Sequence, residues 1–256
     1  MARKLPIGIQ NFEDLRRNGY LYVDKTELLY QVATGGKAYF LSRPRRFGKS
    51  LLMSTMEAYF LGKKELFTGL AMESLETEWK EYPVLHLDLN ARNYDSKEAL
   101  TAILNQHLEK WEIIYGDEKK DRSPEERFSY LLNKIHDTTG LQAVVLIDEY
   151  DKPLLQTIGQ KELQGQYKEI LKAFYGVLKS SDAHLRFVFL TGVTKFGQVS
   201  VFSDLNQLKD ISMDARYATI CGITDEELRK NFQPELEVLA ANEGFDYEGV
   251  CQRMKQ

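Results

Sequence analysis

The sequence predicts an α/β fold in which a mostly parallel β-sheet is sandwiched by helices. Four short apolar runs bounded by turn residues or charges are typical of strands that are buried on both faces: residues 37–41, 83–89, 143–147 and 185–190. Segments with a helical hydrophobic period lie between these runs. Strands that alternate with helices need crossover connections, which favours parallel pairing.

The helices are predicted from the spacing of their apolar side chains. Three segments share a 3.6-residue period: residues 50–62, 96–115 and 166–181. Gly62 can end the first of them. Ahead of the first strand, residues 20–32 lead into a helix that begins near Lys25.

The sequence becomes more polar near residue 223, and the alternation of apolar runs and helices ends there. Thr224 and Glu227 have the spacing of a capping box, which opens a new helix, and the chain from there is helical and polar. We therefore expect an α/β core with an N-terminal lead-in segment, residues 1–222, and the beginning of a helical lid, residues 223–256. The lid resembles a helical unit that is cut short.

Composition excludes several classes of protein. The chain has 256 residues, 43% of them hydrophobic, which suffices for one large core or two modest ones. A net charge of -4 gives no global basic field for nucleic acid, and no apolar run approaches the roughly 20 residues of a membrane span. No signal peptide is evident, and Cys221 and Cys251 are typical of reduced thiols. We expect a cytoplasmic protein without a membrane partner.

A Gly-Lys-Ser tripeptide follows the first predicted strand. The phosphate-loop pattern G-x-x-x-x-G-K-[ST] also asks for an earlier glycine, and that position is Arg43. Roughly one chain in ten of this length would contain the tripeptide by chance. The context favours a phosphate loop, because a buried strand precedes it and a helix follows, whose N-terminus supplies free N–H groups.

Each residue type in this loop has a chemical reason. Gly48 lets the backbone approach the phosphates, Lys49 reaches the β- and γ-phosphates, and the Ser50 hydroxyl joins the shell of a Mg²⁺ ion. The arginines add positive potential, or are solvated charge, or bind a partner. The expected nucleotide-binding segment comprises Arg43, Pro44, Arg45, Arg46, Phe47, Gly48, Lys49 and Ser50.

An acidic pair at the end of the third apolar run supports the same interpretation. Asp148 is expected to hold Mg²⁺ together with Ser50, and Glu149 to polarise the attacking water as a general base. The alternative is an ordinary pair of solvated carboxylates at a strand end. Taken jointly with the loop, the pair predicts that the chain binds a nucleotide with Mg²⁺.

Further candidates follow the fourth apolar run. Hydroxyls of Thr191 and Thr194 could sense the γ-phosphate or orient the water, although threonine is also common in strands and turns. Arg216 could stabilise charge in the transition state, in cis or across an interface. Residues 20–32 suit a contact on the adenine side of the nucleotide.

With these residues in view, the chain resembles the AAA-ATPase-like family of predicted bacterial and archaeal ATPases. Five stretches carry the resemblance, and together they cover nearly all of residues 5–230: 5–29, 39–60, 144–154, 187–196 and 204–228. The family's loop is similar to Arg-Pro-Arg-Arg-Phe-Gly-Lys-Ser, so Arg43 is a departure of the family from the general pattern. The resemblance implies an AAA+-related P-loop NTPase fold with the phosphate-loop strand central, a helical lid, and ATP as the nucleotide.

Three functions compete. The first is Mg²⁺-dependent ATP hydrolysis coupled to a conformational change in a lid or partner, and the second is a nucleotide-gated switch with little or no hydrolysis. A third, a nuclease built on residues 148–152, is disfavoured because Glu149 and Lys152 are one residue too far apart for E-x-K spacing. Family members often carry a C-terminal nuclease-like domain, so that domain or another protein is an expected partner. The oligomeric state and any nucleic acid stay open.

Overall fold

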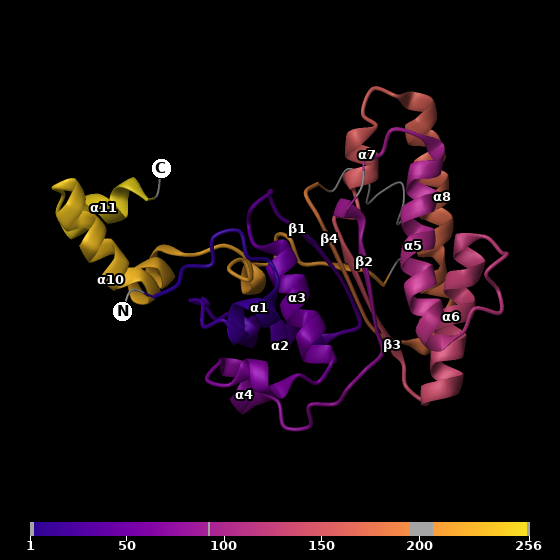
Figure 1. Ribbon diagram of the computed structural model, residues 1–256, viewed down its shortest axis with the longest axis horizontal. Helices are drawn as coiled ribbons and strands as arrows, with labels where there is room; N and C mark the ends of the chain where they lie inside the picture. The colour runs from indigo at the N-terminus through magenta and orange to yellow at the C-terminus, as the bar shows by residue number, and fades with distance from the viewer. Residues whose placement is uncertain (1–2, 92, 195–206, 255–256) are drawn as a thin grey trace.

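The computed structural model describes residues 3–91, 93–194 and 207–254 and consists of a central sheet with helices on both faces and a helical pair beside it (Figure 1). In the described part, five strands form the sheet in the order β2-β3-β4-β1-β5, and all neighbours are parallel. The strands are β1 (Ala38–Ser42), β2 (Val84–Asp88), β3 (Ala143–Asp148), β4 (Leu185–Gly192) and β5 (Lys209–Asp210). The α/β fold is therefore as predicted.

The helices of the described ranges lie before β1, between successive strands and after β5. They are α1 (Phe12–Arg17), α2 (Thr26–Gly35), α3 (Lys49–Phe60), α4 (Ala71–Leu75), α5 (Lys97–Tyr115), α6 (Pro124–Thr139), α7 (Lys152–Gln156), α8 (Lys161–Ser180), α10 (Asp225–Glu243) and α11 (Tyr247–Arg253). None of them is long and apolar enough to cross a bilayer.

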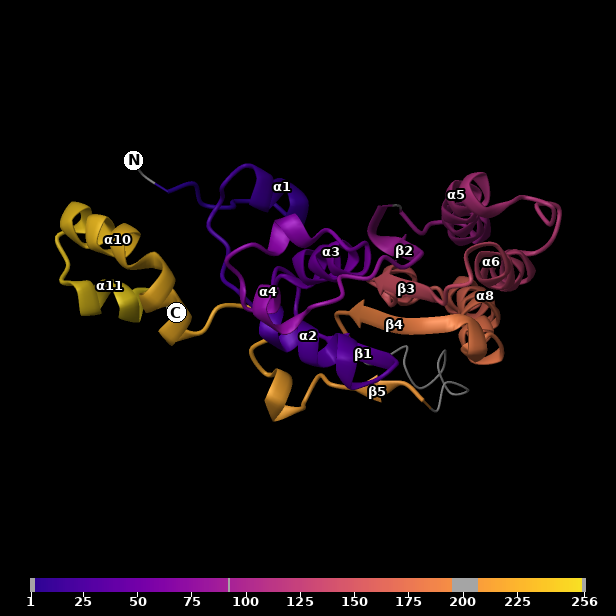
Figure 2. The ribbon, with the colours of Figure 1, turned by 90° about the horizontal axis from the view of Figure 1, so that it is seen from below.

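Side chains that alternate along the buried strands give the molecule its layers. In β3, Val145 and Ile147 join the apolar cluster formed with α5, α6 and α8, whereas Val144 and Leu146 join the cluster formed with α2 and α3. Figure 2 has these two groups of helices on opposite sides of the sheet. Every residue of β3 is buried, which explains why its sequence is a continuous apolar run.

The strand order brings the carboxyl ends of β1, β4 and β3 together. The strand before the phosphate loop, β1, is an interior strand, but the central position belongs to β4, which lies between β1 and β3. This corrects the expectation of a central phosphate-loop strand. Leu41 lies beside Thr191, and Ile147 beside Leu190. The loop after β1 and the acidic residues after β3 therefore flank the end of β4.

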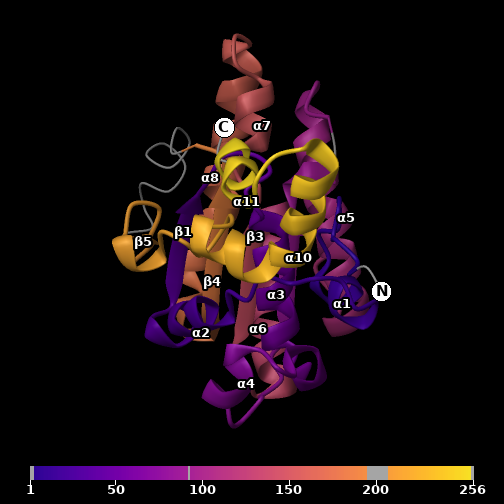
Figure 3. The same ribbon diagram turned by 90° about the vertical axis from the view of Figure 1, so that its left-hand side faces the viewer.

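The helices α10 and α11 form a small unit beside the layered core (Figure 1), and in the view of Figure 3 this unit lies in front of the core. The Thr224 hydroxyl accepts the N–H of Glu227 at 3.1 Å, and the Glu227 carboxylate accepts that of Thr224 at 2.8 Å, so the predicted capping box is present. Four buried side chains form the centre of the unit: Leu236, Ala240, Val250 and Cys251. Two ion pairs link α10 to the lead-in segment, which is the part of the chain before β1: Lys25 pairs with Glu227, and Arg3 pairs with Glu235.

Candidate nucleotide-binding site

The turn between β1 and α3 has the geometry of an anion-binding loop. Gly48 has a φ of 86°, in the left-handed region, and nothing lies within 4 Å of where a Cβ would stand. The helix α3 begins at the next residue, so its free N–H groups face the concave side of the loop. Arg46 also has a positive φ of 65°, a conformation that is uncommon for residues other than glycine.

The ammonium group of Lys49 is buried and fully engaged. Only 4% of this residue is exposed. Its Nζ donates to the carbonyls of Arg43 at 3.1 Å and Pro44 at 3.2 Å, and it lies 3.1 Å from a carboxylate oxygen of Glu149. Three acceptors match the three hydrogens of an ammonium group. A phosphate that binds Lys49 would therefore take the place of one of these partners, and Glu149 is the side chain among them, whereas the other two are backbone carbonyls.

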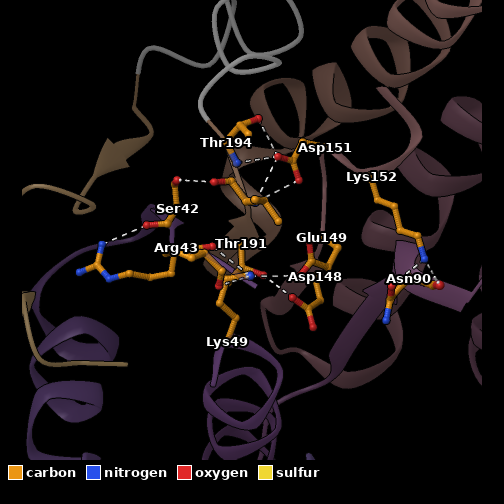
Figure 4. A network of polar contacts seen from close by, with 12 residues as sticks. Ser42, Arg43, Lys49, Asn90, Asp148, Glu149, Asp151, Lys152, Thr191 and Thr194 are labelled. Carbon is orange, nitrogen blue, oxygen red and sulfur yellow. Dashed lines mark hydrogen bonds and ion pairs between the residues drawn. The ribbon is translucent and has the colours of Figure 1, made fainter. Parts of the chain in front are cut away.

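The acidic pair lies at the end of β3, beside the end of β4 (Figure 4). Asp148 is buried and accepts a hydrogen bond from the Thr191 hydroxyl. Glu149 follows with a φ of 55°, which turns its side chain out of the strand direction towards Lys49. Burial raises the pKa of the Glu149 carboxyl above its ordinary value, and the charge of Lys49 offsets part of that rise. A raised pKa suits a group that accepts a proton from water.

A buried carboxylate joins the turns after β3 and β4. Asp151 is 1% exposed and accepts the backbone N–H groups of Val193 at 3.1 Å and Thr194 at 2.7 Å, and the Thr194 hydroxyl at 2.9 Å. The N–H of Tyr150 donates to the Thr191 carbonyl at 2.9 Å. Gly192 fits between these turns because a Cβ there would lie 2.5 Å from the Tyr150 ring. Hydrogen bonds therefore hold the ends of β3 and β4 together.

Two cavities meet at the loop. A polar cleft of about 840 Å³ is lined by Lys49, Ser50, Glu149 and Lys152, among others. An apolar pocket of about 210 Å³ lies on the other side of Gly48, between the lead-in segment, the loop and residues 220–223. One cavity has the charges that a polyphosphate needs, and the other has the apolar walls that a flat aromatic ring needs.

A comparison with known protein families agrees with this geometry. A family model described as Predicted AAA-ATPase matches residues 6–202. The chain belongs to the predicted AAA-ATPase family. The resemblance inferred from the motifs is thereby confirmed, and the matched range contains the phosphate loop and the acidic pair.

A curated relative of this AAA-ATPase-family chain carries no functional name. It is an "Uncharacterized protein in vnfD 5'region" from Azotobacter chroococcum mcd 1, 39% identical over 254 residues, which is 96% of this chain and 49% of the relative. The chain thus spans about half the length of that relative. No solved structure matches the chain.

The structure of this AAA-ATPase-family member gathers most of the predicted residues at one edge of the sheet. Lys49, Asp148, Glu149 and Thr191 are linked by direct contacts, and Ser50 and Asp148 line a common cavity beside them. Thr194 lies one step further out, where it contacts Asp151. Within the loop, Arg45 and Arg46 are exposed and line the polar cleft, Pro44 is exposed and gives its carbonyl to Lys49, and Phe47 lines the apolar pocket.

Two predicted arginines point elsewhere. The guanidinium of Arg43 donates to the carbonyls of Ser212 at 2.7 Å and Tyr217 at 3.2 Å, so it supports the segment after β5. Arg216 forms an ion pair with Asp214 two residues away. Neither arginine lines the polar cleft, and both guanidinium groups would have to leave these partners to reach a phosphate there.

The sequence also held residues that our reasoning did not select. Asp151 lies three residues after Asp148, the last residue of β3, so its position near a strand end could have identified it as a candidate. Asn90 and Lys152 line the polar cleft from the ends of two neighbouring strands. Ile220 and Phe232 line the apolar pocket, and no sequence pattern connects them with the loop.

Proposed function

We propose that the chain binds ATP with Mg²⁺ and hydrolyses its terminal anhydride bond. The observation that carries the proposal is the convergence of Lys49, Asp148 and Glu149 beside the N-terminus of α3. These groups supply a cation for the β- and γ-phosphates, a carboxylate for the metal and a base for the water.

The donor set near Ser50 fits Mg²⁺. The Ser50 hydroxyl and the Asp148 carboxylate line one cavity, and both are oxygen ligands. In the described residues no group of three or more His, Cys, Asp or Glu side chains could hold a metal by itself. Mg²⁺ in nucleotide sites takes one or two protein oxygens and completes its shell with phosphate oxygens and water. When bound, the ion neutralises charge on the phosphates.

The apolar pocket is the proposed base site. Tyr22 from the lead-in segment, Phe47 from the loop and Ile220 line it, and an aromatic base would lie between them. The family supports adenine as the base. The earlier expectation that residues 20–32 contact the adenine side is part of this proposal, because Leu21, Tyr22 and Lys25 belong to the lining.

Hydrolysis would begin with a change of partner at Lys49. The triphosphate takes the ammonium group, and the Glu149 carboxylate is released from its ion pair. Glu149 then accepts a proton from water as the water oxygen attacks the γ-phosphorus, and the bond to the β-phosphate oxygen breaks to give ADP and phosphate. The raised pKa of Glu149 makes it a stronger base than an exposed glutamate.

Coupling to the helical pair α10 and α11 is the second half of the proposal. We divide the chain into an ATPase core, residues 1–222, and a lid, residues 223–256. The apolar pocket includes Ile223 and Phe232 from the lid side and Lys25 from the core side. A base that fills the pocket adds contacts between these two sides, so binding and release would change how the lid is held.

A nucleotide-gated switch is the alternative, and the resting Lys49–Glu149 ion pair favours it, because the pair holds the base in an unproductive position. Calorimetric titration with ATP, with and without Mg²⁺, together with phosphate release tests both. Mg²⁺-dependent binding with turnover supports the ATPase, and binding without turnover supports the switch. Absence of nucleotide binding by the folded chain would refute both.

A further inference from the structure

The polar cleft has a second lysine on the wall opposite the phosphate loop. Lys152 is the first residue of α7 and follows the turn after β3 that carries the acidic pair. Its Nζ donates to the backbone carbonyl of Asn90 and to the Asn90 side-chain oxygen at 2.6 Å. In Figure 4 the acidic pair lies between Lys49 and Lys152. The two lysines therefore face the same cleft from different sides.

The partners of Lys152 leave its charge available. Both oxygens of Asn90 are neutral, so they orient the ammonium group without cancelling its charge. Among the described residues, no carboxylate lies within ion-pair distance of Lys152, whereas Lys49 is paired with Glu149. A cation that is oriented but not neutralised, in a cleft shaped for polyphosphate, is suited to bind an anion.

Two other candidate cations, Arg43 and Arg216, have partners of their own. The guanidinium of Arg43 is held by backbone carbonyls, and Arg216 is neutralised by Asp214. Arg45 and Arg46 line the cleft from the loop itself, on the same side as Lys49. Of the described cations that line the cleft, Lys152 is thus the one that lies on the side of Glu149.

We propose that Lys152 contacts the γ-phosphate from the wall opposite the phosphate loop and stabilises the charge that builds up on it during hydrolysis. The proposal rests on the function proposed above, because it needs a triphosphate with its β- and γ-phosphates at Lys49. The attacking water then lies beside Glu149, and Lys152 supplies in cis a charge that other nucleotide hydrolases take from an arginine. Asn90 is the positioning residue that aims the ammonium group.

A structural role makes a different prediction. The contact between Lys152 and Asn90 also ties the end of β2 to the start of α7, and a tie of that kind would matter for folding alone. Three variants separate the two roles. Lys152→Met keeps the apolar stem and removes the charge, Lys152→Arg keeps the charge, and Asn90→Asp keeps the tie but neutralises the ammonium group.

The experiment compares ADP with a non-hydrolysable triphosphate analogue by calorimetry, and measures phosphate release at saturating ATP and Mg²⁺. We expect Lys152→Met to keep its ADP affinity within about twofold and to lose about tenfold in affinity for the triphosphate, because only the latter has a γ-phosphate. Turnover should fall about 10²–10³-fold. Asn90→Asp should fall similarly in turnover with its melting temperature kept, and Lys152→Arg should retain most of the wild-type rate.

Each outcome decides something. Equal triphosphate affinity and equal turnover in Lys152→Met would overturn the inference while the proposed function stands, and so would a loss of ADP affinity as large as that for the triphosphate. If wild type binds the triphosphate but shows no turnover, the ratio of the two affinities decides alone. If wild type binds neither nucleotide, the proposed function fails first and this inference fails with it.

Discussion

The carboxyl-terminal ends of β3 and β4, here called the sheet edge, and the α10–α11 pair are held together by different kinds of contact. At the edge, buried groups are joined by short internal hydrogen bonds, such as those of Asp151 to the turn after β4. The helical pair has a centre of four buried side chains and leaves Val238 and Met254 more than half exposed. Its ion pairs to the core involve partly exposed side chains, and such pairs contribute little, about 0–1 kcal/mol each.

The difference teaches where precision is needed. Groups that carry out phosphoryl transfer must be held in place before the substrate arrives, because misplacement costs rate. In the function proposed above, the helical pair responds to the nucleotide and would have to move, and elements with few buried contacts open at low cost in free energy. The proposed base pocket lies between the two regions. Five predictions on four variants test this contrast, beginning with the largest effect.

Glu149→Gln should abolish most turnover and leave nucleotide affinity intact or increased. The amide cannot accept the proton of water, and loss of a general base costs about 10²–10⁴ in rate. Because Lys49 also loses its ion pair, it becomes more available to the phosphates. Phosphate release and ATP titration measure the two effects. Wild-type turnover in the variant would move the role of base to another group.

Lys49→Ala should weaken ATP binding by roughly 10- to 150-fold, since charge-assisted hydrogen bonds are worth about 1.5–3 kcal/mol. Calorimetry on the folded variant measures this. An unchanged affinity would remove the phosphate-loop assignment.

The same variant has a pH signature. Without Lys49 the buried Glu149 carboxyl keeps only the causes that raise its pKa, namely burial and the neighbouring carboxylates. A raised pKa in the folded state stabilises the fold while the carboxyl is protonated, and this stability is lost as pH rises through that pKa. The melting temperature of Lys49→Ala should therefore fall further below wild type at alkaline pH than at acidic pH. A difference that does not vary with pH would contradict the buried environment of Glu149.

Asp151→Asn should lower the free energy of unfolding by about 1–3 kcal/mol, because an amide NH₂ would face the N–H groups of Val193 and Thr194. Asp246→Asn in the helical pair is the matched control. Asp246 caps α11 through the N–H of Gly249, and asparagine caps helices as well as aspartate. Denaturant unfolding of both variants measures the contrast. Equal losses would mean that the sheet edge is no more tightly specified than the helical pair.

Lys25→Met should have the smallest effect, a change of a few-fold in ATP affinity and less than about 1 kcal/mol in stability. Its ion pair with Glu227 ties the helical pair to the core at the base pocket. The wild-type affinity should also decline with added salt more than that of the variant, since salt screens partly exposed pairs. Identical salt dependence in both proteins would show that this pair does not control the pocket.

The sequence predicts the strands well for a physical reason. A strand buried on both faces must be apolar throughout, so β1, β3 and β4 are visible as runs in the sequence. The strand β2 lies at one end of the sheet and buries only alternate residues, Leu85 and Leu87. The edge strand β5 has two residues, Lys209 and Asp210, and pairs through its backbone, so it leaves no such signal. The helix α6 was not predicted, although the sequence contains a signal for it: Ser123 and Glu126 form a capping box, and a proline stands in the first turn.

The positions of the candidate site residues at strand and helix ends could be predicted from the sequence, but the residues that their side chains contact could not. Motif spacing pointed to Lys49, Asp148 and Glu149, because those roles depend on local strand and helix ends. The directions of Arg43 and Arg216 depend on which distant segments lie nearby, and no local pattern encodes that. The strand order is of the same kind. His86 lies in the predicted strand of residues 83–89 and in β2, yet its ring pairs with Glu57 on α3, and only the fold reveals that contact.

One backbone contact joins the loop to the chain just before the helical pair. The carbonyl of Phe47, in the phosphate loop, accepts the N–H of Gly222 at 3.0 Å. Gly222 stands two residues before Thr224, the cap of α10. In the coupling proposed above, a shift of the loop would therefore act at the first turn of a 19-residue helix. At about 1.5 Å per residue that helix is about 28 Å long, so a rotation of a few degrees at its base would displace its far end by ångströms.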